Sequence, residues 1–562
     1  MSTRTRFIIG LIVFSATSAI PEAQAGTTRA AMGEEGMVVS AHPGATQAGL
    51  DVLKASGNAI DAAVATSFAI AVAEPYGSGL GGGGFAVIWK DGKAESLDFR
   101  EMAPKAAHRD MYLVDGAVDP EKSRTGNMSV AVPGMVQGLW DLHQKHGTLP
   151  WSDLVSPAIR LAEEGIMVST LLHGHIKRSC KRFNDAARNI FCPGGQALAP
   201  GSQLVQTDLA ATLKLIAANG AAGFYKGTVA HNIRESVHSE TYAMTEKDFD
   251  GYRTVWRTPI QGKYKGRSIY SMPPPSSGGI HLIQMLNLIE SYDFESWGYG
   301  SANTLHILIE VMKFAFADRS QWLGDPDFFP VPQNRLLSKD HLDNIRSKIT
   351  MEKAIPASAV EGAPVPKEGR DTTHLSIVDR DGNAVASTLT INLSFGSGMV
   401  AKGTGVILND EMDDFAAAPG APNAFGLLGS EANAVEPGKR PLSSMTPTIV
   451  TENGKVLIVA GSPGGSRIIT TTLQVIVHLI DFKMDIASAV NVPRIHHQWY
   501  PTKVYYEPFG LSPDTIGILQ KRGHATESST FMGNAQGVYV DPETNIRYGS
   551  SDWRGIGYAA GY

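Results

Sequence analysis

Two adjacent threonines, Thr372 and Thr373, open a strand-like stretch of the sequence, "TTHLSIVD". A threonine at a strand start is ordinarily just a good strand former. Its hydroxyl becomes a nucleophile only when a base takes its proton, and the α-amino group of an N-terminal threonine is one such base. That chemistry requires a cut between Asp371 and Thr372. Residues 352–371 contain prolines, alanines and charges without periodicity, which predicts an accessible loop where a cut is sterically possible.

A second hydroxyl is expected beside Thr372 if the following hairpin has the right register. The sequence "DRDGN" separates the two strand-like stretches. A three-residue loop with Gly382 in the left-handed conformation would pair Thr372 with Thr390 on one face of the sheet. A two-residue loop would shift the register by one and point the two side chains to opposite faces. Thr-Thr pairs are also common in purely structural positions, so the pairing alone does not establish a catalytic role.

Two glycine-rich turns are candidates for anion binding. "LIVAGSPGGSRIITTTLQ" reads as strand, turn and helix, so the N–H groups of Gly464 and Gly465 suit either a developing oxyanion or a structural turn. No lysine follows to make a phosphate-binding loop. Residues 77–82, "GSGLGG", match the dinucleotide fingerprint, but they follow a predicted helix and open a strand, which favours a structural turn. No serine lies in a GxSxG nucleophile elbow.

The elements that must position these residues divide along the chain. Helical spacing dominates from about residue 130 to 350, and strand patterns dominate after Thr372. This order predicts an α+β protein with sheet layers covered by helices. The net charge of −6 argues against nucleic-acid binding, which needs a basic surface.

The cysteines and histidines give few signs of a metal site. Cys180 and Cys192 are the two cysteines of the chain, and either one disulfide or two thiols fits their spacing. The sequence contains neither CxxC nor HExxH, so no zinc site is predicted. His496 and His497 have no identifiable partner and are assigned to the core or to an interface.

The N-terminus predicts export. Arg4 and Arg6 precede an apolar stretch from Phe7 to about Ile20, and a small-x-small cleavage pattern follows at residues 23–25. An uncleaved membrane anchor is the alternative, but the apolar run is short for a span and is diluted by Ser and Thr. We therefore expect a signal peptide over residues 1–25 and a soluble, periplasmic or secreted mature protein without a stable membrane span.

Several long motifs occur together: "LDFREMAP", "DTTHLSIVDRDGNAVASTLTIN", "NDEMDDFAAAPGAPNAFGLLG", "KRPLSSMTPTIV" and "GSPGGSRIITT". In this order they resemble the γ-glutamyltransferase (γ-glutamyltranspeptidase) family of N-terminal-nucleophile hydrolases, over nearly the whole mature chain. The resemblance implies a four-layer αββα sandwich. It also implies a precursor that cuts itself before Thr372, giving a large subunit (26–371) and a small catalytic subunit (372–562) that interlock as a heterodimer.

The resemblance also implies a role for individual residues. Thr372 would attack the γ-glutamyl amide of glutathione or a related donor, and water, an amino acid or a dipeptide would accept the acyl group; no cofactor or metal is expected. The implied assignments are Thr390 as hydrogen-bond partner of Thr372, Gly464 and Gly465 as oxyanion hole, Arg100, Ser443 and Ser444 for the donor carboxylate, and Asn392, Glu411 and Asp414 for its α-amine. These types suit a zwitterion, since guanidinium complements carboxylate and carboxylate complements ammonium.

One position in the resemblance varies. "PGAPNAFGLLG" resembles a lid loop over the donor pocket, with Phe425 where some relatives carry a tyrosine, so a lid hydroxyl contact to Asn392 would be missing. Two other functions are alternatives to a γ-glutamyltransferase. A glutaryl-cephalosporin acylase of the same fold would not need the α-amine residues, and an exported binding protein would keep the pocket but stay uncut.

Overall fold

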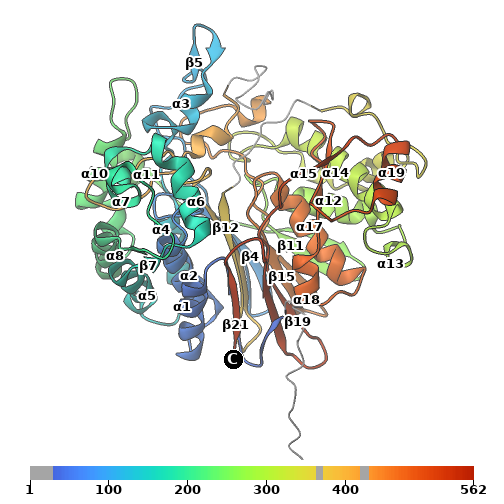
Figure 1. The fold of residues 1–562 in the computed structure, drawn as a ribbon, viewed down its shortest axis with the longest axis horizontal. Helices are drawn as coiled ribbons and strands as arrows, with labels where there is room; N and C mark the ends of the chain where they lie inside the picture. Colours follow the sequence, from blue (N-terminus) through green and yellow to red (C-terminus); the bar gives the residue numbers. More distant parts are fainter. Residues whose placement is uncertain (1–28, 363–370, 418–429) are drawn as a thin grey trace, which may run out of the picture.

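Two seven-stranded sheets lie face to face at the centre of the computed structural model, which describes residues 29–362, 371–417 and 430–562 of one uncut chain (Figure 1). The first sheet has the order β21 (Tyr558–Gly561), β2 (Met37–Ser40), β12 (Thr372–Val378), β13 (Ala384–Thr390), β3 (Gly83–Lys90), β4 (Lys93–Phe99) and β9 (Val255–Arg257). The second has the order β1 (Ala31–Gly33), β20 (Arg547–Ser551), β19 (Gln536–Val540), β15 (Lys455–Gly461), β14 (Thr448–Glu452), β11 (Arg267–Ser271) and β10 (Ile260–Tyr264).

Helices cover the outer face of each sheet (Figure 1). The first sheet is covered by α1 (Pro43–Lys54), α2 (Ala59–Ala73), α4 (Met135–His146), α5 (Trp151–Glu164) and α8 (Thr207–Asn219), which share one core with it. The second is covered by α12 (Gly278–Ile289), α14 (Ala302–Trp322), α17 (Arg467–Ile480) and α18 (Ile486–Asn491). The predicted four-layer αββα sandwich is confirmed.

A third apolar core fills the space between the sheets. Its side chains alternate with outward-facing ones along the strands, as in Val39 on β2, Phe85 on β3 and Val459 on β15. Every residue of α2 is buried, which explains why its sequence is apolar on all sides rather than amphipathic. The helix begins at a capping box in which Asn58 and Asp61 bond each other's backbone N–H groups.

The hairpin that carries the threonines has the predicted register. Thr372 pairs with Thr390, and Val378 pairs with Ala384 at the other end of the ladder. Gly382 adopts φ +79°, as the three-residue loop requires. Because β12 lies between β2 and β13, Thr372 begins an interior strand of the sheet.

The glycine turn at residues 77–82 is structural, as predicted, since it joins α2 to β3. A Cβ on Gly82 would lie 2.0 Å from the carbonyl oxygen of Thr390. Only glycine therefore allows this turn to approach the end of β13 so closely. The motif that resembles a dinucleotide fingerprint thus packs against the hairpin end that holds Thr390.

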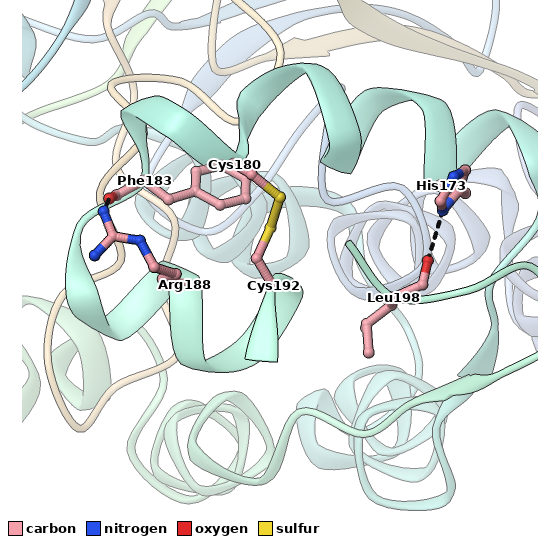
Figure 2. The surroundings of a disulfide bond; sticks show 6 residues. All are labelled: His173, Cys180, Phe183, Arg188, Cys192 and Leu198. Carbon is pink, nitrogen blue, oxygen red and sulfur yellow. Dashed lines mark hydrogen bonds between the residues drawn. A yellow bond between two sulfur atoms is a disulfide. The ribbon is translucent and has the colours of Figure 1, made fainter. Parts of the chain in front are cut away.

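A disulfide joins the two cysteines, which resolves the alternatives left open by the sequence (Figure 2). Cys180 follows α6 (Thr170–Ser179) and Cys192 follows α7 (Asp185–Phe191), so the bond ties the ends of two short helices together. Next to it, His173 of α6 hydrogen-bonds the carbonyl oxygen of Leu198 at 2.8 Å. The disulfide thus holds the end of α6 in place, and other residues of α6 line the cavity described below.

Other sequence expectations have mixed outcomes. His496 and His497 are buried core residues, as expected. The segment before the predicted cut is less open than expected, because Ala357 and Val360 are buried and the indole of Trp499 donates to the Ala357 carbonyl. Residues 1–25, the predicted signal peptide, lie outside the described ranges. Within those ranges no helix is both long and apolar enough to cross a bilayer.

Candidate active site

Thr372 and Thr390 place two buried hydroxyls together at the end of the central hairpin. Their oxygen atoms are 3.5 Å apart. The Thr390 hydroxyl accepts the backbone N–H of Asn392 at 2.8 Å and lies 3.4 Å from the carbonyl oxygen of Asp371. In the uncut chain, one hydroxyl therefore lies near both the predicted nucleophile and the carbonyl of the bond predicted to break.

A cavity of about 580 Å³ opens beside Thr372 and is also lined by Gly464. Gly464 and Gly465 have φ values of +132° and +59°, and they form the turn between β15 and α17. Such backbone is accessible to glycine and strained for other residues. The turn therefore lies where its backbone can face a group bound to Thr372, as an oxyanion hole requires.

The residues predicted to hold the donor meet in a largely buried cluster around Arg100, called the Arg100 pocket below. Its guanidinium donates to Glu411 and, at 2.5 Å, to Asp414, although 311 residues separate Arg100 from Glu411. Its Nε donates to the carbonyl of Pro441 at 3.3 Å, just before Ser443 and Ser444. The sequence prediction assigned Arg100 and the acids to opposite ends of a zwitterion. In the structure they contact each other directly, because a buried charge needs a partner.

This pocket contains more acidic than basic groups. Glu101 lies 3.8 Å from the Arg100 guanidinium, so three carboxyl groups, of which Glu101 and Glu411 are fully buried, surround this arginine. The buried guanidinium of Arg319 also acts on Asp414 as a second cation. Burial raises the pKa of both Glu411 and Asp414, and Arg100 opposes the rise. The neighbouring carboxyl groups of Glu101 and Asp414 raise the pKa of Glu411 further, since each disfavours ionisation of the other. A ligand ammonium would relieve this crowding.

Ser443 is held by the loop at residues 275–277. Its backbone N–H donates to the carbonyl of Pro275 at 3.0 Å, and its own carbonyl accepts the N–H of Ser277 at 2.8 Å. The Nε of Arg319 donates to the Ser277 hydroxyl at 2.9 Å and so supports this loop. The buried Ser444 hydroxyl has no hydrogen-bond partner among the described residues, which leaves it available to a ligand.

Asn392 lies between the nucleophile and the Arg100 pocket. It has φ +72°, and its side-chain amide donates to the carbonyl of Asp410 at 3.0 Å, next to Glu411. Phe425, the predicted lid residue, falls in 418–429, outside the described residues. Apart from that residue, the structure brings all the predicted site residues to two adjoining places: the hairpin end with its cavity, and the Arg100 pocket.

Sequence reasoning missed Glu74 and Tyr76, which line the cavity with Thr372. The Tyr76 hydroxyl donates to Glu74 at 2.8 Å. Burial raises the pKa of Glu74 to about 7, and the hydrogen bond from Tyr76 opposes the rise. The available signal was position, since "EPY" immediately precedes the glycine turn that packs against Thr390.

One other group has the residue types of a metal site. His306, Glu310 and His524 have potential ligand atoms within 4.8 Å of one another and are buried. The two histidine rings, however, hydrogen-bond each other at 2.7 Å, and Glu310 accepts from Lys313 at 2.7 Å. These polar atoms are therefore satisfied by protein partners.

Comparison with known proteins assigns the family. The model of the family described as gamma-glutamyltranspeptidase matches residues 45–562. The chain belongs to the γ-glutamyltranspeptidase family. It is 46% identical over 536 residues to the glutathione hydrolase proenzyme of Escherichia coli (strain K12), covering 94% of this chain and 92% of that protein. The predicted family is thus confirmed, and the protein is an enzyme.

Acylases are also similar to this chain. The acylase ACY 1 proenzyme of Pseudomonas sp. (strain V22) is 38% identical over 542 residues, covering 94% of this chain and 93% of that protein. A solved structure of a cephalosporin acylase from Bacillus halodurans matches with a TM-score of 0.85 and 30% identity, over 98% of this chain and 99% of that one. Fold similarity alone therefore does not choose between γ-glutamyl and glutaryl donors.

Proposed function

We propose that this member of the γ-glutamyltranspeptidase family cuts itself between Asp371 and Thr372 and then hydrolyses or transfers the γ-glutamyl group of glutathione and related amides. The observation that carries the proposal is the position of Thr372. Its hydroxyl lies beside that of Thr390, and Thr372 lines a cavity that Gly464 also lines.

The first step is the cut itself. The Thr372 hydroxyl attacks the carbonyl carbon of Asp371, the peptide C–N bond breaks, and the acyl group passes to the threonine oxygen as an ester. Water then hydrolyses the ester, which leaves Asp371 as a carboxyl terminus and Thr372 with a free amine. The Thr390 hydroxyl, 3.4 Å from the carbonyl oxygen, is placed to donate to that oxygen as negative charge develops.

Turnover uses the amine that the cut has released. An α-amino group has an unperturbed pKa near 8, so a substantial fraction is neutral at neutral pH and can take the proton of the Thr372 hydroxyl. The hydroxyl attacks the γ-glutamyl carbonyl, and the leaving amine departs with that proton. The N–H groups of Gly464 and Gly465 stabilise the oxyanion. Water or a second amine then attacks the γ-glutamyl ester and regenerates Thr372.

The Arg100 pocket would recognise the α-carbon end of the donor. Arg100, Ser443 and Ser444 would bind its carboxylate, and Asn392, Glu411 and Asp414 its ammonium. A bound zwitterion would take over the contact between Arg100 and the two acids. The excess of carboxyl groups supports a donor with an α-ammonium group, which a glutaryl donor lacks.

The route of the protein through the cell is part of the same proposal. Cleavage of residues 1–25 would release an exported protein whose large subunit spans residues 26–371 and whose small subunit spans 372–562. Intact masses and N-terminal sequencing of the purified exported protein test both cuts. A small chain that begins Thr-Thr-His-Leu is expected. A single uncut chain would favour the binding-protein alternative and rule out this mechanism.

The acylase alternative has its own test, because it is favoured by the structural match to a cephalosporin acylase. Initial rates are measured for a γ-glutamyl amide and for the glutaryl amide of the same leaving group. The γ-glutamyl donor is expected to react faster, since only it carries the α-ammonium group. Faster cleavage of the glutaryl amide would reassign the protein to the acylases.

A further inference from the structure

The cavity beside Thr372 is distinct from the cluster of residues around Arg100. The pocket residues Arg100, Glu411, Asp414, Ser443 and Ser444 do not line it, whereas Thr372 and Gly464 do. If the γ-glutamyl group occupies the Arg100 pocket, as the proposed function requires, then the remainder of the donor extends into this cavity. After that remainder leaves, the acceptor amine must enter the same space.

One wall of the cavity is a single face of α6. Leu171, His175 and Arg178 all line it, and their spacing of four and three residues places them on the same side of the helix. The His175 ring stacks on Tyr76 with 4.1 Å between the ring centroids, and its Nδ1 is hydrogen-bonded with Ser394 at 2.8 Å. These contacts fix the helix face relative to Thr372.

Arg178 supplies the positive charge of this wall. Burial, together with the neighbouring Arg178, lowers the pKa of His175 to about 4, so the imidazole is neutral near pH 7. Arg178 itself is exposed at the cavity edge. Its guanidinium can therefore meet a ligand without the cost of burying an unpaired charge.

The other lining residues include two arginines that have protein partners, and an aromatic ring. Arg467 donates to the Ser529 hydroxyl at 3.2 Å, and its guanidinium lies 5.7 Å from the centre of the Tyr505 ring. Arg554 is bonded to Glu507 and Asp552, so its charge is already matched. Phe531 is 48% exposed and packs edge-on against Trp553, with ring centroids 4.6 Å apart. A ligand in the cavity would thus find both an exposed guanidinium and an apolar ring in its lining.

We propose that Arg178 binds the carboxylate of the leaving group and of the acceptor, so that the enzyme prefers donors and acceptors with a free carboxylate beyond the reacting nitrogen. The leaving group of glutathione is a dipeptide that ends in such a carboxylate. The contact would be a charge-assisted pair at the cavity edge, where solvent weakens but does not abolish it.

Charge reversal tests the proposal. Arg178→Glu is compared with wild type in kcat/KM for glutathione and for γ-glutamyl-p-nitroanilide, whose leaving group is uncharged. The ratio of the two values, glutathione over anilide, is expected to fall roughly fivefold, as for loss of one solvent-exposed ion pair. Arg178→Lys is expected to restore most of the ratio. Rates are expressed per mole of cut protein, so that altered maturation does not enter.

Lys177→Glu is the matched control, because it makes the same charge change on the neighbouring exposed residue, which does not line the cavity. The proposal is wrong if this variant lowers the ratio as much as Arg178→Glu, or if Arg178→Glu leaves the ratio unchanged. Acceptor use gives a second readout: the preference for glycylglycine over glycylglycinamide should fall in parallel. A wild-type protein that cleaves neither donor would instead refute the proposed function.

Discussion

Replacing Thr390 by valine should uncouple folding from maturation. Valine keeps the shape and the β-branch of threonine but removes the hydroxyl that lies 3.5 Å from the Thr372 oxygen and 3.4 Å from the Asp371 carbonyl oxygen. Loss of one donor to a developing oxyanion slows acyl transfer by roughly 10²–10³-fold. The half-time for conversion of precursor to two subunits should lengthen by about that factor.

The same substitution has a separate cost in stability. The N–H of Asn392 now donates to the Thr390 hydroxyl at 2.8 Å and would be left buried without an acceptor. An unsatisfied buried group of this kind costs about 1–3 kcal/mol. Stability and maturation must therefore be measured separately. A suitable control variant loses a buried hydrogen bond, and so loses stability, without slowing maturation.

Thr388→Val provides that control. Thr388 lies on the same strand, and its hydroxyl is hydrogen-bonded at 2.8 Å with the buried ring of His374, away from the Asp371 carbonyl. Precursor and subunits are quantified by intact mass over time after synthesis of each variant. Thr388→Val should mature at nearly the wild-type rate, and Thr390→Ser should recover much of the loss. Equal maturation rates for the two valine variants would refute the reasoning.

Three further perturbations test the pocket, the helix tie and the cavity. Arg100→Met would leave the buried Glu411 without its ion-pair partner, which should lower the free energy of unfolding by about 3–5 kcal/mol, measured by urea denaturation of uncut Thr372→Ala protein. Retained stability would show that this carboxyl group is neutral in the pocket. Replacing Cys180 and Cys192 by serine should lower the free energy of unfolding by about 2–3 kcal/mol, and a reductant should then have no additional effect on the melting temperature. Glu74 has a folded-state pKa of about 7 against an ordinary 4.5, so its contribution to stability is complete below about pH 4.5 and is lost as pH rises through about 7. Relative to wild type, Glu74→Gln should therefore gain up to about 3 kcal/mol of stability over that range, and a pH-independent difference between the two would contradict the assigned pKa.

Local rules limited the register at the nucleophile to two alternatives. A three-residue loop with glycine at the left-handed position pairs Thr372 with Thr390, whereas a two-residue loop in "DRDGN" would not, and the structure has the three-residue loop. The structural role of the turn at residues 77–82 was predictable for a similar reason. The fingerprint requires strand then helix, and the chain here runs from helix to strand.

Contacts between distant segments were beyond those rules. The pairing of Arg100 with Glu411 joins residues 311 apart, and no periodicity specifies it. Glu74 and Arg178 line the cavity because α2 and α6 end near the hairpin, which depends on how the helices pack on the sheet. The two cysteines admitted a disulfide or two thiols, and the docking of α6 against α7 decided between them.

The order of the strands has a consequence for how the protein is inactivated by heat. Both sheets contain strands from before Thr372 paired with strands from Thr372 onward, in the neighbouring pairs β21·β2, β2·β12, β13·β3, β1·β20 and β14·β11. While the chain is continuous, all these pairings form within one molecule. After a cut at Thr372, an unfolded molecule would become two fragments, each with unpaired strand edges that invite aggregation. Heat inactivation of the cut protein should then be irreversible, and its lifetime should be set by the height of the unfolding barrier instead of by an equilibrium between folded and unfolded forms.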